Sequence, residues 1–252
     1  MRARGSILYL LPSLLTTGNL FAGLYAIIAV MNANYMFAAI ALLIALIFDG
    51  LDGKFARMTN TTSRFGLEYD SLVDVVSFGV APGILIYSWA LSARGMFGSA
   101  VVFAFVACAA LRLARFNAQS SGDDNRFFVG LPVPAAAGVI ATLVIFDHHI
   151  LRLGREVKPL LILSITLILA FLMVSVIRYR SFKEFDFKKG RQFNYLVIAV
   201  LVLMLVSAAP QLTLFVLFVG YALSGPLEPL VRVLMKKLIV QPVTHDMGDP
   251  KE

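Results

Sequence analysis

The chain has 252 residues, of which 59% are hydrophobic and 15% are charged, and its mean hydropathy is positive. A soluble domain is typically about 45–50% apolar, so this composition excludes an ordinary soluble protein and indicates a polytopic membrane protein. The formal net charge of +7 does not indicate nucleic acid, because the basic residues border apolar segments; anionic membrane lipids are the expected partners.

Apolar runs long enough to cross about 30 Å of hydrocarbon recur along the whole chain. They predict an all-α fold, a polytopic membrane bundle of about eight transmembrane helices. The expected crossings are residues 14–30, 35–54, 68–91, 96–116, 131–148, 159–177, 195–209 and 211–223. The last two are short and meet at Pro210, so we expect a hairpin or a re-entrant pair there.

The distribution of basic residues orients the chain. With eight crossings and a cytoplasmic N-terminus, the inner side holds all of the 22 Lys and Arg residues except Arg94, Arg152, Arg155 and Lys158. The positive-inside rule therefore predicts that both termini lie in the cytoplasm. In this orientation the turn between the second and third crossings also opens toward the cytoplasm.

Four aspartates, Asp49, Asp52, Asp70 and Asp74, interrupt the apolar residues around that turn. Each uncompensated charge near the bilayer centre costs about 2.5–3.5 kcal/mol. Asp49 and Asp52 are three residues apart and Asp70 and Asp74 are four apart, so each pair projects from one face of a helix. Two facing helices would bring the four carboxylates to one pocket, where a bound divalent cation would offset their cost.

The kinds of residue present indicate which cation this would be. Carboxylate oxygens suit hard cations such as Mg²⁺, Mn²⁺ or Ca²⁺, whereas zinc usually recruits Cys or His. The Cys and His residues of the chain all lie elsewhere, at Cys108, His148, His149 and His245. A zinc site is therefore not expected.

The aspartates belong to a longer pattern with the spacing D-x-x-D-G-x-x-A-R-x(8)-G-x-x-x-D-x-x-x-D, formed by Asp49, Asp52, Gly53, Ala56, Arg57, Gly66, Asp70 and Asp74. At every fixed position this pattern resembles the signature of the CDP-alcohol phosphatidyltransferases. Three further segments, Asp70–Pro82, Leu111–Asn117 and Phe128–Ala137, are similar to the bacterial integral-membrane phosphatidylserine synthases within that family. The resemblance covers residues 8–225.

The resemblance implies roles for the residues of the signature. Asp49, Asp52 and Asp70 would be ligands of two divalent cations, Mg²⁺ or Mn²⁺, and Asp74 would be both a ligand and the general base. The CDP group would be bound by Gly53, Ala56, Arg57 and Gly66. Asn19 lies in a polar patch of the first crossing and is a further candidate for the CDP site, with a polar contact between helices as the alternative.

The acceptor is indicated less directly. Arg112 and Arg115 lie three residues apart at the cytoplasmic end of the fourth crossing. They either flank the membrane, as the positive-inside rule predicts, or bind an anionic group of the acceptor through the forked guanidinium. Charge does not distinguish a serine carboxylate from glycerol phosphate, so the choice of L-serine rests on the resemblance.

The expected function is transfer of the phosphatidyl group from CDP-diacylglycerol to L-serine, giving phosphatidylserine and CMP. A phosphatidylglycerophosphate synthase, or another member of the family, is the alternative within the enzyme class. A cation-coupled transporter and a non-catalytic membrane scaffold are the alternatives from other classes. Intramembrane acids also mark cation pathways, but a transporter would carry them on several distant helices.

The apolar runs, the charge distribution and the resemblance together predict a domain plan and a location. We expect an interfacial segment at residues 1–13, a six-helix catalytic core at 14–180, a basic cytoplasmic loop at 181–194, a transmembrane hairpin at 195–225 and a cytoplasmic tail at 226–252. The expected location is the bacterial inner membrane, with the active site facing the cytoplasm. A homodimer is the expected assembly.

Overall fold

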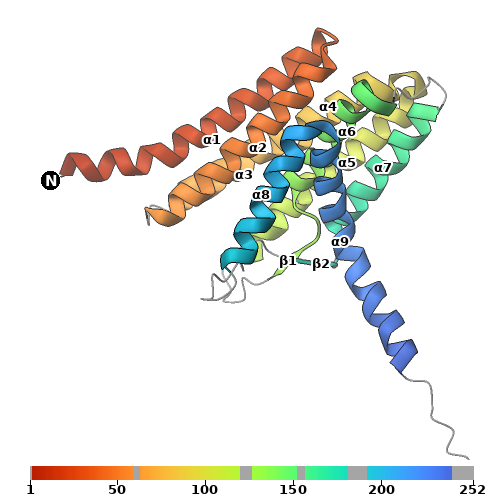
Figure 1. Ribbon diagram of the computed structural model, residues 1–252. Helices are drawn as coiled ribbons and strands as arrows, with labels where there is room; N and C mark the ends of the chain where they lie inside the picture. Colours follow the sequence, from red (N-terminus) through yellow and green to blue (C-terminus); the bar gives the residue numbers. More distant parts are fainter. Residues whose placement is uncertain (1, 60–62, 120–126, 152–156, 181–191, 240–252) are drawn as a thin grey trace, which may run out of the picture.

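The computed structural model describes residues 2–59, 63–119, 127–151, 157–180 and 192–239, and it begins with two long antiparallel helices. These are α1 (Arg2–Met31) and α2 (Tyr35–Met58), which run side by side in Figure 1. Ala26, Ala38 and Ala45 are almost completely buried. Such small side chains allow the backbones of packed helices to approach closely.

A long helical rod follows, made of α3 (Arg64–Asp74), the π-helical segment η1 (Val75–Val80), α4 (Ala81–Ile86) and a second π-helical segment, η2 (Tyr87–Leu91). A short 3-10 turn, η3 (Ser92–Arg94), ends the rod. Gly95 then adopts φ +55°, a conformation that glycine tolerates without steric cost, and α5 (Gly95–Gln119) begins there. The reversal at Gly95 lets α5 return along the rod.

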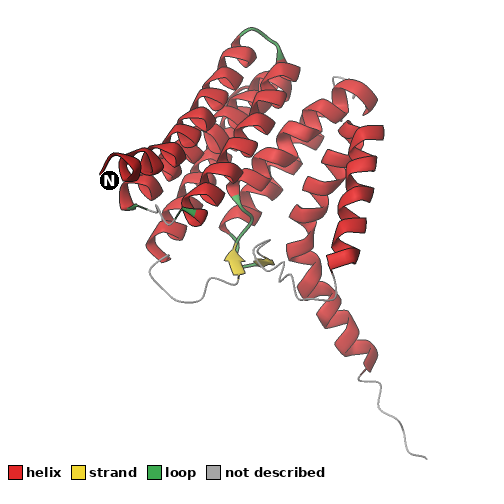
Figure 2. Cartoon of the chain, turned by 60° about the vertical axis from the view of Figure 1, so that its left-hand side comes forward, coloured by secondary structure: helices red, strands yellow, loops and turns green. Residues whose placement is uncertain are grey.

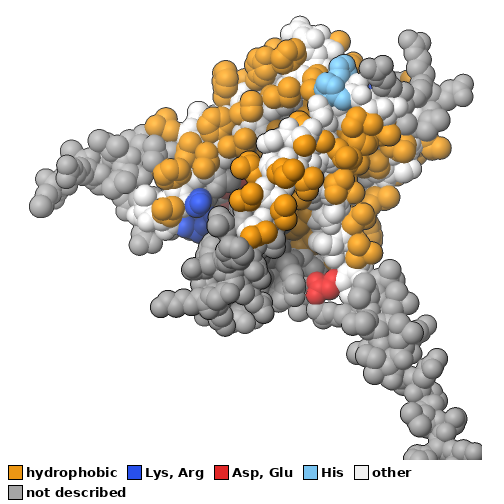
Figure 3. All heavy atoms as spheres, in the orientation of Figure 1, with side chains coloured by type: hydrophobic (Ala, Val, Ile, Leu, Met, Phe, Trp, Pro, Cys, Tyr) orange, Lys and Arg blue, Asp and Glu red, His pale blue; other side chains and the backbone are white. Residues whose placement is uncertain are grey.

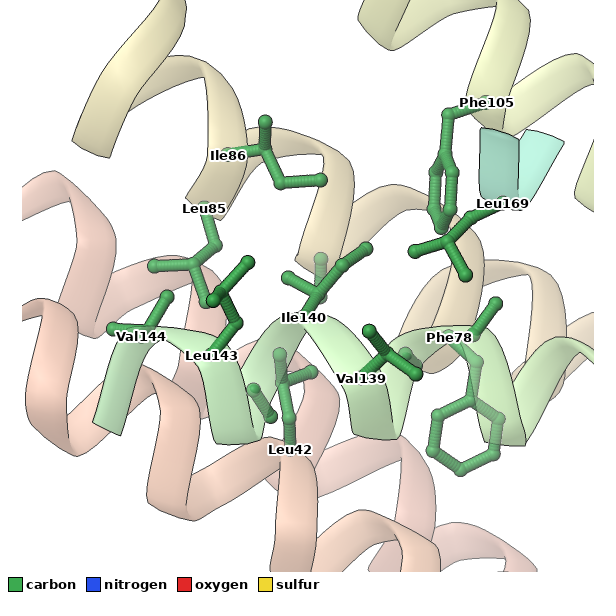
Figure 4. Packing of buried hydrophobic residues seen from close by; sticks show 14 of the residues in the cluster. Leu42, Phe78, Leu85, Ile86, Phe105, Val139, Ile140, Leu143, Val144 and Leu169 are labelled. Carbon is green, nitrogen blue, oxygen red and sulfur yellow. The ribbon is translucent and has the colours of Figure 1, made fainter. Parts of the chain in front are cut away.

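The central helix of the bundle is α6 (Val133–Phe146), and nearly all of its residues are buried. A helix that is buried on every side has protein neighbours on every side, and α2, α4 and α9 are among those that contact it. In Figure 4, Ile140 and Leu143 lie between Leu42 of α2 and Leu85 of α4. A π-helical segment, η4 (Asp147–Leu151), continues α6, and α7 (Val157–Val174) packs against α5.

Two short strands are the exception to the helical fold. β1 (Phe127–Val129) and β2 (Arg178–Arg180) pair in antiparallel register, with Phe128 opposite Tyr179. Figure 2 shows them at one end of the bundle, between red helices. β1 precedes α6 and β2 follows α7, so the ladder joins the segment that enters α6 to the segment that leaves α7.

The last two helices are α8 (Gln192–Ala208) and α9 (Pro210–Ile239). α9 packs closely against α6, since a Cβ atom added at Gly138 would overlap the ring of Phe218. α9 also continues past the expected hairpin boundary at residue 225, and α1 passes the expected boundary at residue 13 without a break. The expected basic loop at 181–194 lies mostly outside the described residues, so the domain plan stays a prediction.

Several helical stretches among the described residues are long and apolar enough to cross a membrane: Pro12–Met31, Tyr35–Met58, Arg64–Ala118, Val133–Leu151 and Pro210–Glu228. The third contains both the rod and α5, and Lys158–Val174 is apolar but shorter. Phe21, Phe103 and Phe171 are more than two-thirds exposed, as expected where lipid covers the protein. Hydrophobic side chains likewise cover much of the face in Figure 3. The all-α polytopic membrane bundle is confirmed, while the count of eight crossings stays a prediction.

Candidate active site

The predicted aspartates gather where the C-terminal half of α2 faces α3. One carboxylate oxygen from each of Asp49, Asp70 and Asp74 lies within 4.8 Å of the other two. Asp52, one helical turn further along α2, lines a cleft that also includes Asp70. The structure therefore brings three of the four predicted ligands into one cluster and places the fourth beside it.

Two side chains of α1 contact these carboxylates. Thr16 Oγ1 donates a hydrogen bond to Asp52 Oδ2 at 2.7 Å, and Asn19 Nδ2 donates to Asp74 Oδ1 at 3.4 Å. Both donors lie on one face of α1 because they are three residues apart. Thr16 was not among the residues predicted from the sequence, although it belongs to the same polar patch as Asn19. Their hydrogen bonds restrain carboxylates that are only 4% and 6% exposed.

The cluster fits a divalent cation. Asp70 Oδ1 and Asn19 Oδ1 are buried and have no hydrogen-bond partner among the described residues. A buried oxygen without a partner costs free energy, and a cation held among the carboxylates would remove that cost for Asp70. Oxygen donors are also the ligands that hard divalent cations prefer.

An open cleft borders the cluster between α1, α2 and α3. Several of its lining residues belong to the signature: Asp52, Gly53, Ala56, Gly66 and Asp70. The small residues leave room for a ligand to approach the backbone closely. The N-terminal turn of α3 also borders the cleft, where backbone N–H groups favour an anion.

Two other candidates for the CDP site lie outside the lining of this cleft. Arg57 is exposed and folds over Gly53, because a Cβ atom added at Gly53 would lie 3.4 Å from Arg57 Nη1. Its positive charge favours the ionised forms of the Asp49 and Asp52 carboxylates. Asn19 lies against Asp74 and is fully buried. Arg57 is thus placed at the mouth of the carboxylate cluster and Asn19 within it.

Arg112 lies close to the carboxylate cluster. Gly79 of the rod packs against Ala109 of α5, and since the helices are antiparallel, Arg112 comes near the level of Asp74. Arg112 is 6% exposed, and the negative charge of Asp74 favours the protonated form of its guanidinium. Its Nε has no hydrogen-bond partner among the described residues. A buried guanidinium with an unsatisfied N–H donor is suited to bind an anionic ligand.

Arg115, one turn further along α5, donates its hydrogen bonds to backbone carbonyls instead. Its Nη1 donates to the carbonyl of Val174 at 3.0 Å, and its Nη2 donates to the carbonyl of Val129 at 2.9 Å. A Cβ atom added at Gly130, which has φ +81°, would lie 3.0 Å from Arg115 Nη2 and would overlap the carbonyl of Met173. Arg115 therefore ties the end of α5 to β1 and to the end of α7.

Residues 9–177 match the family model for the CDP-alcohol phosphatidyltransferases. The chain is 39% identical over 233 residues to the CDP-diacylglycerol–serine O-phosphatidyltransferase of Helicobacter pylori, covering 91% of this chain and 96% of that protein. It is 34% identical over 174 residues to the Bacillus subtilis protein of the same name, covering 69% and 92%. Archaetidylserine synthase of Methanothermobacter thermautotrophicus is 38% identical over 171 residues, covering 67% and 69%.

The chain belongs to the CDP-alcohol phosphatidyltransferase family. It is a multi-pass membrane enzyme, a transferase of phospholipid synthesis, and not a transporter or a scaffold. Members of this family in general depend on divalent metal ions, which agrees with the carboxylate cluster.

Proposed function

We propose that the chain transfers the phosphatidyl group from CDP-diacylglycerol to the hydroxyl of L-serine and releases CMP. The observation that carries this proposal is the carboxylate cluster beside a cleft formed by the small residues of the signature. The names of the relatives from Helicobacter pylori and Bacillus subtilis supply the two substrates. A carboxylate cluster that holds divalent cations, next to a cleft lined partly by small residues, suits a substrate that carries a pyrophosphate.

The donor would lie in the cleft, with its cytidine and phosphates against Gly53, Ala56 and Gly66. The proposed metal ligands are Asp49, Asp52, Asp70 and Asp74, and the proposed ions are two Mg²⁺ or Mn²⁺. When bound, such cations neutralise the pyrophosphate and stabilise the departing CMP. Arg57 would add positive charge at the mouth of the cleft.

Asp74 is the proposed general base. It would take the proton from the serine hydroxyl as the hydroxyl oxygen forms a bond to the phosphorus that carries diacylglycerol. The bond from that phosphorus to the oxygen of CMP then breaks, and CMP leaves with the bonding electrons. The hydrogen bond from Asn19 supports this role, because it restrains the orientation of the Asp74 carboxylate.

The acceptor would be held through its carboxylate. Of the two predicted acceptor residues, Arg112 has the unpartnered Nε and lies near the level of Asp74 on the neighbouring helix, which supports a direct contact with the acceptor. Arg115 is engaged with backbone carbonyls, and we propose that it shapes the acceptor site through β1 and α7. A guanidinium binds a carboxylate through two parallel hydrogen bonds, which fixes the position of the acceptor hydroxyl.

The location follows from the charge pattern. We propose that the enzyme lies in the bacterial inner membrane with the carboxylate cluster and both termini on the cytoplasmic side, where anionic lipids would contact its basic borders. The homodimer stays a prediction.

The test is an acceptor assay with purified full-length protein in mixed micelles. CDP-diacylglycerol and Mn²⁺ are incubated with labelled serine or labelled glycerol 3-phosphate, and the lipid product and CMP are measured. We expect serine-labelled lipid and CMP in equal amounts. Labelled lipid formed only from glycerol 3-phosphate would contradict the proposal and identify the alternative acceptor, whose phosphate Arg112 would also bind.

A further inference from the structure

A cavity of about 420 Å³ lies at the end of the bundle opposite the carboxylate cluster. It is lined by Tyr35, the first residue of α2, and Asp49 lies about 21 Å further along the same helix at about 1.5 Å per residue. In Figure 1 this is the end where α1 turns into α2, away from the β1–β2 ladder. The volume falls within the range of about 300–1,000 Å³ that is usual for small-molecule sites.

A largely buried ion pair forms one wall of this cavity. Lys158 Nζ, near the start of α7, lies 2.8 Å from Asp147 Oδ2, at the start of η4, and the two side chains are 19% and 5% exposed. Lys158 Nζ also lies 4.1 Å from the centroid of the Trp89 ring, on η2. Taking two charges out of water has a large free-energy cost that their attraction often fails to offset, so stability alone is a poor explanation for this pair.

The lining of the cavity offers partners for both a positive and a negative group. The ammonium of Lys158 has three N–H donors, so it can bind a ligand oxygen in addition to Asp147, and the exposed His148 adds an imidazole at the rim. Asp147 supplies a carboxylate, and the aromatic faces of Tyr35 and Trp89 attract cations. The charges of Asp147 and Lys158 cancel, so the described lining suits a zwitterionic ligand better than a simple anion.

An apolar stripe leads away from the cavity along α2. Phe37 lines the cavity and is 60% exposed, and Ile40 and Ile44 follow it on the same helix face, 38% and 44% exposed. A smaller cavity of about 170 Å³ also borders Phe37, and it shares Asn34 with the first. An exposed apolar stripe that begins at a polar cavity has the layout of a lipid, with a headgroup in the cavity and an acyl chain along the stripe.

We propose that this cavity binds the headgroup of a zwitterionic phospholipid with a primary ammonium, from the leaflet opposite the carboxylate cluster. The lipid phosphate accepts hydrogen bonds from Lys158 and His148, the ammonium donates to Asp147, and one acyl chain lies along the α2 stripe. A quaternary ammonium has no N–H group to donate, so it forms a weaker contact with the carboxylate. Tyrosine and tryptophan side chains, such as Tyr35 and Trp89, are typical of the headgroup level of a membrane.

The experiment uses the fluorescence of Trp89, the only tryptophan of the chain, which lines the cavity. Purified full-length protein in a non-ionic detergent is titrated with phosphatidylethanolamine, phosphatidylcholine or phosphatidylglycerol of equal chain length. Phosphatidylethanolamine carries the primary ammonium, phosphatidylcholine a quaternary one, and phosphatidylglycerol is an anion. Native mass spectrometry counts the lipids bound by the wild type and by each variant.

Two variants alter the cavity in different ways. Lys158→Gln removes the cation, whereas Asn34→Phe places a ring in the cavity and keeps the ion pair. Asn34 is exposed and its side chain makes no capping hydrogen bond to α2, so this substitution is compatible with the fold. Arg94→Gln is the matched control, because Arg94 is an exposed cation at the end of the rod and is not part of the described cavity lining.

We expect a saturable fluorescence change with phosphatidylethanolamine, at an affinity at least about tenfold tighter than for the other two lipids, because each of those lacks a charge-assisted hydrogen bond to Asp147. Lys158→Gln and Asn34→Phe should each weaken this binding at least about tenfold. Arg94→Gln should bind phosphatidylethanolamine like the wild type.

Equal affinities for the three lipids, tighter binding of phosphatidylglycerol, or wild-type affinity in Asn34→Phe would overturn the inference. If loss of the ion pair prevents Lys158→Gln from folding, Asn34→Phe decides the question. None of these measurements uses the transfer reaction, so a negative result here leaves the proposed function unaffected, and failure of the acceptor assay leaves this inference unaffected.

Discussion

Arg112 and Arg115 lie one helical turn apart on α5, yet Arg115 donates hydrogen bonds to the carbonyls of Val129 and Val174 while Arg112 keeps a buried Nε without a partner among the described residues. Two residues that look equivalent in the sequence therefore meet different surroundings. Arg115 supports the backbone near the site, and Arg112 keeps a buried donor that is available to a ligand.

This difference predicts different outcomes for two identical substitutions. Arg112→Lys should raise KM for serine at least about tenfold with little change in KM for CDP-diacylglycerol, because an ammonium does not reproduce the planar fork. Arg115→Lys should instead lower the melting temperature, because it loses hydrogen bonds to the backbone carbonyls. Steady-state kinetics and thermal unfolding of both variants check this. Equal KM changes for both substrates in Arg112→Lys would contradict binding of the acceptor by Arg112 and would support the alternative, a charge that only flanks the membrane.

Asp70→Asn and Asp74→Asn should each abolish transfer while the protein remains folded and inserted. Asp70 has a buried oxygen that lacks a partner and Asp74 is the proposed base, so each loss removes chemistry without exposing apolar surface. Turnover should fall at least about a hundredfold, the lower end of what a general base contributes. Size-exclusion profiles control for folding. A folded variant that retained a third of the wild-type turnover would show that these roles are wrong.

Chelation should stop the reaction. EDTA is expected to abolish activity, and Mn²⁺ or Mg²⁺ should restore it, because the cluster offers only oxygen ligands. Elemental analysis of the purified enzyme gives an independent measurement. Full activity in chelator, with no metal found, would exclude the proposed ligands.

Thr16→Val tests the hydrogen bond from α1. Losing the donor to Asp52 should raise the Mg²⁺ or Mn²⁺ concentration needed for half-maximal activity about tenfold, the usual effect of removing a partner of a metal ligand. Thr17→Val is the control, since Thr17 is exposed and, among the residues that the structure describes, its hydroxyl bonds to Ser13 and Tyr69 and not to a carboxylate. The same metal dependence in both variants would show that Thr16 has no such role.

Gly130→Ala should destabilise the protein. A non-glycine residue at φ +81° costs about 1–2 kcal/mol, and the new methyl group would also overlap the carbonyl of Met173. Gly220→Ala on α9 is the control, because nothing lies within 4 Å of its added Cβ atom and alanine favours a helix. Thermal unfolding should separate the two variants, and equal melting temperatures would show that the turn at Gly130 tolerates a side chain.

The sequence by itself determined the membrane class and the pairs of acids. Helical periodicity is a local property, so spacings of three and four residues place Asp49 with Asp52 and Asp70 with Asp74 on helix faces before any packing is known. Hydrophobicity over a window is local as well, which is why the expected crossings lie close to the helices of the structure.

Only the tertiary structure decided which side chains from distant segments meet. The hydrogen bonds from α1 to Asp52 and Asp74, the separate surroundings of the two arginines, and the hydrogen bond from Tyr179 to the carbonyl of Ala222 all join elements far apart in the chain. Such contacts depend on how whole helices pack, and no residue spacing encodes them. The β1–β2 ladder was missed for the same reason, because strands of three residues are too short to show a periodic pattern and exist only where folding brings them together.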